Sequence, residues 1–208
     1  MYDTFQLENG ITVIAEKIDY VHSVSIGIFV YHGSRHEDEE CAGASHFIEH
    51  MLFKGTQNRS AKKIAEEFDS IGGHLNAYTT KEYTCYYAKV LNTHMDMAAD
   101  VLSDMLLHSN LNPNDLNLER HVIEEEIHMT QDVPEELVHD MMLEAAWGSQ
   151  AGLGSSILGS EETLEKMDSD FLRSYMDQYY TPGNMVISAV GNFNVGELRC
   201  LLQKKFGE

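Results

Sequence analysis

The order in which the periodic segments follow one another limits the fold of this 208-residue chain most strongly. Alternating apolar residues predict strands near both ends, whereas helical spacing dominates from about residue 93 to about residue 180. Doubly wound parallel sheets need a regular alternation of helices and strands, which this chain lacks. We therefore expect an α+β fold, in which a mostly antiparallel sheet has helices packed on one face. Residues 1–208 should form one such domain.

Local signals place six strands along the chain. Asn9-Gly10 separates two alternating runs, which is the strongest short-range signal for a hairpin, and a third strand should end at Gly33. The segment 74–91 is typical of two strands hinged near Thr80. A late buried strand is expected over 184–193.

Helical periodicity and capping residues predict the remaining elements. Ser60 is the expected N-cap of the second helix and Gly72-Gly73 its end, while Asn194 should cap a terminal helix. The other predicted helices cover 44–53, 93–108, 113–130, 134–147 and 161–180. The last of these should be broken near Asp168.

The charge balance narrows the classes of partner. With 14 basic and 34 acidic residues, the net charge is −20, which disfavours nucleic acid and anionic membranes. No apolar run is long enough for a transmembrane helix, and the first residues lack the features of a signal peptide, so we expect a cytoplasmic protein. The three cysteines form no C-x-x-C pair, which argues against a cysteine zinc site.

The stretch ASHFIEHMLFKGT, residues 44–56, places three polar side chains on an apolar helix. At about 100° per residue, His46, Glu49 and His50 project within about a third of the helix circumference. The opposite side is apolar and should pack on the core. Histidines at i and i+4 can bind one metal ion through their ring nitrogens. Glu49 is then placed to act as a general base on a metal-bound water.

A catalytic zinc site needs a third protein ligand, and spacing alone leaves several candidates on the acidic helix 113–130. These candidates are Glu119, His121, Glu124, Glu125, Glu126 and His128. The expected apolar seam of this helix contains Leu116, Leu118, Val122, Ile123 and Ile127. Glu119 and Glu126 lie beside that seam, whereas Glu124 and Glu125 should point further out. A nucleophilic site built on Cys41 and His46 is disfavoured, because acidic neighbours raise the pKa of a thiol.

The motif H-x-x-E-H, with Glu126 on a helix 76 residues after His50 (126 − 50), resembles the pitrilysin-like or inverzincin zinc peptidases. This group includes insulin-degrading enzyme and mitochondrial processing peptidase. The chain is most similar to the N-terminal half of the bacterial relatives of the latter. The resemblance covers nearly the whole chain, including RHVIEEEI, IGGHLNAYTTKEYTCYYAKV, LGSSILGSEETL and YYTPGNMVISAVGNF.

The resemblance implies roles for five polar residues of the two helices. His46, His50 and Glu126 would bind Zn²⁺. Glu49 would be the catalytic base, and Glu119 a catalytic carboxylate that supports the zinc ligands. The implied activity is that of a zinc-dependent endopeptidase, which hydrolyses short or unfolded peptides with a zinc-bound water as nucleophile.

The resemblance also implies how substrates and partners bind. The strand that carries Asn76, Ala77 and Tyr78 would be a sheet edge that pairs with the substrate backbone. Family members carry a second, similarly folded half that closes over the first like a clamshell, so a second half-domain is an expected partner of a chain that stops at Glu208. Whether two such chains also form a homodimer stays open.

Two further hypotheses concern specificity and activity. The net charge of −20 suggests a preference for basic peptides, with the acidic runs 37–40 and 124–126 as contributors. The alternative to an enzyme is a non-catalytic peptide-binding or scaffold subunit of the same fold. Such relatives are expected to have lost metal-binding or base residues, and here all four positions are filled.

Overall fold

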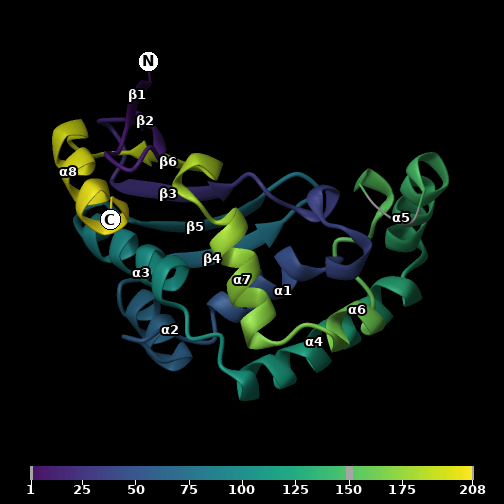
Figure 1. Ribbon diagram of the computed structural model, residues 1–208. Helices are drawn as coiled ribbons and strands as arrows, with labels where there is room; N and C mark the ends of the chain where they lie inside the picture. Colours follow the sequence, from purple (N-terminus) through teal and green to yellow (C-terminus); the bar gives the residue numbers. More distant parts are fainter. Residues whose placement is uncertain (1, 149–151, 208) are drawn as a thin grey trace.

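A six-stranded sheet in the order β1-β2-β6-β3-β5-β4 is the centre of the computed structural model, which describes residues 2–148 and 152–207 (Figure 1). Its strands are β1 (Asp3–Gln6), β2 (Thr12–Lys17), β3 (Ser23–Val30), β4 (His74–Thr79), β5 (Thr84–Leu91) and β6 (Met185–Gly191). Four pairings between these strands are antiparallel and the β2–β6 pairing is parallel. The sheet is thus mixed, though mostly antiparallel as predicted.

The helices gather on one side of this sheet, and α5 lies away from it at one end of the molecule (Figure 1). They are α1 (Ala44–Leu52), α2 (Ala61–Ser70), α3 (Met95–His108), α4 (Pro113–Asp132), α5 (Pro134–Trp147), α6 (Glu161–Glu165), α7 (Ser169–Tyr179) and α8 (Val195–Phe206). Asp168 caps α7, at the break predicted within 161–180. Within the described residues, no helix combines the length and the apolar character needed to cross a membrane.

Alternating burial along β3 explains the one-sided arrangement. Every second residue of this strand, from Val24 to Val30, is at most 1% exposed, whereas the residues between them are partly exposed. The buried set packs against the helices, and each such side chain stabilises the fold by roughly 1.5–3 kcal/mol. The main core therefore lies between the sheet and the helices.

Helix α1 is buried on most sides and brings the H-x-x-E-H motif to the end of the sheet. Phe47, Ile48, Met51 and Leu52 are fully buried, on the side predicted to pack on the core. The opposite side of α1 faces β4 and α4, which α1 contacts directly. The helix thus places its polar side chains between a strand edge and the long acidic helix.

Helix α4 packs through a narrower stripe than the sequence suggested. Leu116, Ile123 and Ile127 are buried as predicted, but Leu118 is 65% and Val122 49% exposed. Leu118 is rotated by about 200° from Leu116 around the helix, and Val122 by about 100° from Ile123. Both therefore leave the stripe that faces α1, and their predicted place in the apolar seam was wrong.

Candidate metal centre

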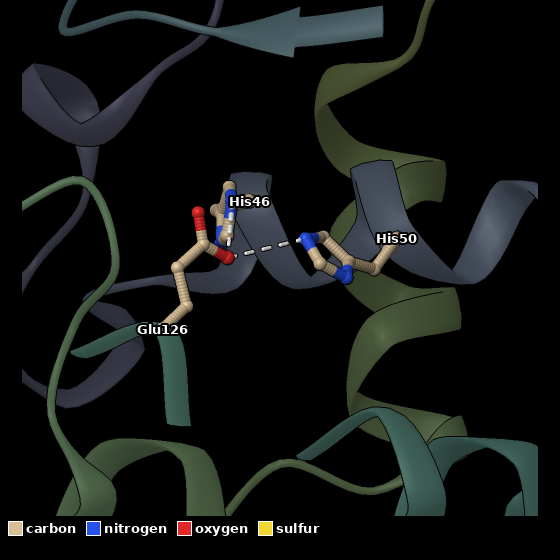
Figure 2. Close-up of side chains that lie close together, drawn as sticks. All are labelled: His46, His50 and Glu126. Atoms are coloured by element: carbon tan, nitrogen blue, oxygen red, sulfur yellow. Dashed lines mark ion pairs between the residues drawn. The ribbon is translucent and has the colours of Figure 1, made fainter. Parts of the chain in front are cut away.

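His46 and His50 of α1 meet Glu126 of α4 at the contact between the two helices (Figure 2). His46 Nε2 lies 3.7 Å and His50 Nε2 3.6 Å from Glu126 Oε2. One donor atom of each residue lies within 4.8 Å of the other two. Donors that bind zinc tetrahedrally at about 2.0–2.1 Å are about 3.4 Å apart. The three residues predicted as zinc ligands thus come together at a spacing that small side-chain rotations would make suitable for zinc.

The state of His46 suits a metal ligand. Its side chain is largely buried, and burial, with a smaller contribution from His50, lowers the pKa of His46 to about 3. The imidazole is therefore neutral at neutral pH and offers a lone pair. Its buried Nδ1 has no hydrogen-bond partner among the described residues, which costs free energy. The other ring nitrogen, Nε2, faces Glu126 and can offer its lone pair to a metal, so the donor set fits zinc.

Glu119 holds His50 from the side opposite Glu126. Glu119 Oε2 lies 3.1 Å from His50 Nδ1, while Glu119 Oε1 lies 2.5 Å from Lys54 Nζ. A carboxylate that accepts from Nδ1 orients the ring and presents Nε2 to a metal. Lys54 balances the charge of this buried carboxylate. Lys54 lies only four residues after His50, but its contact with Glu119 joins distant segments and has no local sequence signal.

Glu49 lies beside the three potential ligands and is held by the end of β4. Thr79 Oγ1 donates a hydrogen bond of 2.5 Å to Glu49 Oε2. Burial raises the pKa of Glu49, and the hydrogen bond from Thr79 opposes this rise. A carboxyl group with a raised pKa is suited to accept and return a proton near neutral pH. Thr79 directly follows the three predicted substrate-binding residues, but its contact with Glu49 has no local sequence signal.

A cleft of about 360 Å³ opens beside these groups. It is lined by His46, Glu49, Ala77, Tyr78, Thr79, Glu126, Thr130, Asp140, Ser156, Ile157 and Leu158. The contributions of Asp140 from α5 and of the segment 156–158 were not predicted. Neither has a local chemical signal, because only the fold brings them to the cleft.

The residues predicted to bind substrate lie on an edge strand. β4 ends the sheet, so one of its edges pairs with no described strand. Asn76 Oδ1 accepts a hydrogen bond of 2.9 Å from the Ala77 N–H. Tyr78 is 39% exposed and contacts Tyr83 and Tyr87 edge-on. Ala77 and Tyr78 line the cleft, whereas Asn76 lies on the strand just outside its lining.

Comparison with known families identifies the chain. Residues 12–161 match the insulinase family of peptidases, family M16. The chain belongs to the insulinase family. Residues 166–208 match a second description, the inactive domain of family M16 peptidases. All the polar residues of the candidate metal centre lie in the first of these two regions.

Insulinase-family relatives of this chain include bacterial zinc proteases. An uncharacterised zinc protease of Bacillus subtilis (strain 168), YmxG, is 50% identical over 93% of this chain. One from Mycobacterium tuberculosis (strain ATCC 25618 / H37Rv) is 42% identical over 97% of it. The chain covers 47% and 46% of these two proteins, so it spans about half of their length.

Solved structures of insulinase-like proteases share the fold. A protease from Helicobacter pylori superposes with a TM-score of 0.94 at 22% identity, over all of this chain and 50% of that one. The first half of the periplasmic protease PqqL from Escherichia coli gives 0.90 at 23% identity, over all of this chain and 46% of that one. These likenesses confirm the predicted α+β fold, and this chain aligns with about half of each of these two longer chains.

Proposed function

We propose that this chain carries the zinc ligands and the catalytic base of an endopeptidase that hydrolyses short or unfolded peptides. The observation that carries the proposal is the convergence of His46, His50 and Glu126 beside the partly buried Glu49. A zinc ion held by the first three would polarise the substrate carbonyl and acidify the attacking water. Glu119 would keep His50 oriented through its Nδ1.

Glu49 would act first as general base and then as general acid during hydrolysis. The attacking water adds its oxygen to the carbonyl carbon and gives a proton to Glu49. Glu49 then passes this proton to the leaving amine as the carbon–nitrogen bond breaks. The hydrogen bond from Thr79 keeps one carboxylate oxygen fixed, so the other is directed toward the water. No covalent intermediate with the protein is required.

The free edge of β4 would bind the substrate as an added strand. The Ala77 N–H is already bonded to Asn76 Oδ1, so an incoming carbonyl oxygen would displace this side chain. Asn76 would then be free to contact the substrate itself. Main-chain pairing requires little of the substrate side chains, which favours short or unfolded peptides over one defined sequence.

A preference for basic peptides is the second part of this proposal. Next to the cleft, and sharing Asp140 with it, lies a hollow of about 580 Å³. Its acidic lining residues are Glu39, Glu40, Asp140, Glu144 and Glu162. Glu37, by contrast, is only 3% exposed, so its predicted contribution to an acidic surface was wrong. Of the second acidic run, Glu126 alone lines the cleft.

The whole protein would need a second half to complete the substrate clamp. Because the chain spans about half the length of its relatives, we propose that a similarly folded half-domain closes over the cleft. A homodimer and a cytoplasmic location stay predictions. A non-catalytic scaffold remains the alternative function, and the presence of both ligand histidines, Glu126 and Glu49 favours the enzyme.

The variant Glu49→Gln distinguishes the enzyme hypothesis from the scaffold hypothesis. This variant should bind zinc like the native protein, because Glu49 is not a ligand, but lose peptide cleavage by about 10²-fold or more. Zinc content and cleavage of an unfolded peptide would be measured on both proteins. A chelator should abolish native cleavage and added zinc should restore it. Near-normal turnover by Glu49→Gln would remove Glu49 from the role of base.

A further inference from the structure

Helix α1, which carries both histidines, begins without a capping side chain of its own. Gly43 occupies the N-cap position at φ +94°, in the left-handed region. A Cβ atom at this position would lie 2.7 Å from the Leu158 carbonyl oxygen, so a larger residue does not fit. The first N–H groups of a helix nevertheless need acceptors when they are buried. For α1 these acceptors must come from another part of the chain.

Glu37 supplies them from the preceding loop. Its Oε2 accepts a hydrogen bond of 2.8 Å from the Gly43 N–H, and its Oε1 one of 2.7 Å from the Ser45 N–H. Tyr175 of α7 donates its hydroxyl to Glu37 Oε1 at 3.2 Å and lies 3.1 Å from Ser45 Oγ. Both carboxylate oxygens are therefore engaged with the first turn of α1.

The position of this contact matters for the metal centre. Ser45, whose N–H binds Glu37, directly precedes His46 in the first turn of α1. The helix dipole favours a negative charge at this end, so the carboxylate stabilises the turn electrostatically as well. If this turn unwound or tilted, His46 Nε2 would move relative to Glu126, whereas residues further along the helix would move less.

We propose that Glu37 is a positioning residue for the metal centre, because it fixes the helix turn that holds His46 against Glu126. The inference rests on the proposed function, since it concerns the same zinc site. Both oxygens are needed. Aspartate is shorter by one methylene group and cannot span both N–H groups, and glutamine would turn an NH₂ donor toward one of them.

A matched control exists at the other end of the chain. Asn194 Oδ1 also accepts from two N–H groups, those of Gly196 at 2.8 Å and Glu197 at 3.2 Å, at the start of α8. Asn194→Ala therefore removes a double cap from a helix that contributes nothing to the cleft. If Glu37 merely stabilised the fold, both substitutions would have the same consequences.

The test measures zinc binding to the metal-free full chain by competition with a chromophoric chelator, with zinc chloride as the probe. Glu37→Gln and Glu37→Asp should bind zinc about tenfold or more weakly, as expected when support of a ligand is lost. Their kcat should fall while KM stays near the native value. Asn194→Ala should lower the thermal unfolding midpoint but leave zinc affinity and kcat unchanged.

The outcomes separate this inference from the proposed function. Glu37 variants with native zinc affinity and kcat would overturn the inference, as would an equal loss of zinc affinity in Asn194→Ala. If the Glu37 variants do not fold, Tyr175→Phe tests the same contact, and it should weaken zinc binding about threefold. Native affinity in that folded variant would count against the inference. A native chain that binds no zinc would refute the proposed function, and the inference with it.

Discussion

Replacing Thr79 with valine should move the pH dependence of peptide hydrolysis to higher pH. Thr79 Oγ1 donates a hydrogen bond of 2.5 Å to Glu49 Oε2, and valine has nearly the same shape without the donor. A hydrogen bond to a charged group contributes about 1.5–3 kcal/mol. Because this bond favours the ionised form of Glu49, its loss should raise the pKa of Glu49 further above the ordinary value.

The size of the shift follows from the same numbers. One pKa unit corresponds to about 1.4 kcal/mol, so complete loss of the bond would equal about one to two units. Glu49 borders an open cleft, where water can replace part of the lost bond, so we expect a shift near the lower limit of about one unit. The ionised base would then be lost at a higher pH as the solution is acidified. The charge of a bound metal acts on both proteins and cancels in the comparison.

The assay is kcat/KM against pH with zinc in excess, for the native protein, Thr79→Val and Thr79→Ser. Serine keeps the hydroxyl group, so the acidic limb of the pH profile of Thr79→Ser should stay close to the native one. The acidic limb of Thr79→Val should move to higher pH. An unmoved limb in Thr79→Val would refute the reasoning. So would a serine variant whose limb moves as far as that of valine.

Three further predictions concern zinc affinity, specificity and stability. Glu119→Gln should weaken zinc binding by about 10–100-fold in chelator competition, because His50 loses its charged partner, while the exposed Glu125→Gln serves as control. Peptides that differ only in lysine and arginine content should be cleaved faster as that content rises, and equal rates would end the basic-peptide hypothesis. Burial opposes ionisation of Asp104, but hydrogen bonds from three neighbours including Arg59 outweigh it and lower its pKa. The stability that this provides at neutral pH should be lost as the pH falls below the ordinary value of 3.8, and urea unfolding of Asp104→Asn should lack that part of the acid dependence.

Local sequence signals were sufficient for most of the secondary structure. The α5 helix was predicted over 134–147 and is observed there, and the break near Asp168 separates α6 from α7. Capping side chains and periodic apolar residues act within a few positions, so a single sequence reveals them. The parallel β2–β6 pair was not predicted, because it joins strands separated by the whole helical block.

In the candidate site, too, local features were predicted and contacts between distant segments were not. His46, Glu49 and His50 share one helix turn, so their spacing alone predicted a common face, while Glu126 needed the resemblance to a family as well. Contacts between distant segments were missed. Thr79 reaches Glu49 across 30 positions, and Glu37 lies in a loop whose acidic run was interpreted as surface charge. Such contacts depend on how the elements pack, which no local pattern contains.

Zinc content per chain, measured on the native protein and on Glu126→Gln after identical dialysis, tests the central claim most directly. We expect about one zinc ion per native chain, because two histidines and Glu126 complete the ligand set. Glu126→Gln should retain far less zinc and lose peptide cleavage in parallel. Equal zinc content in the two proteins would contradict the assignment of Glu126 as the third ligand.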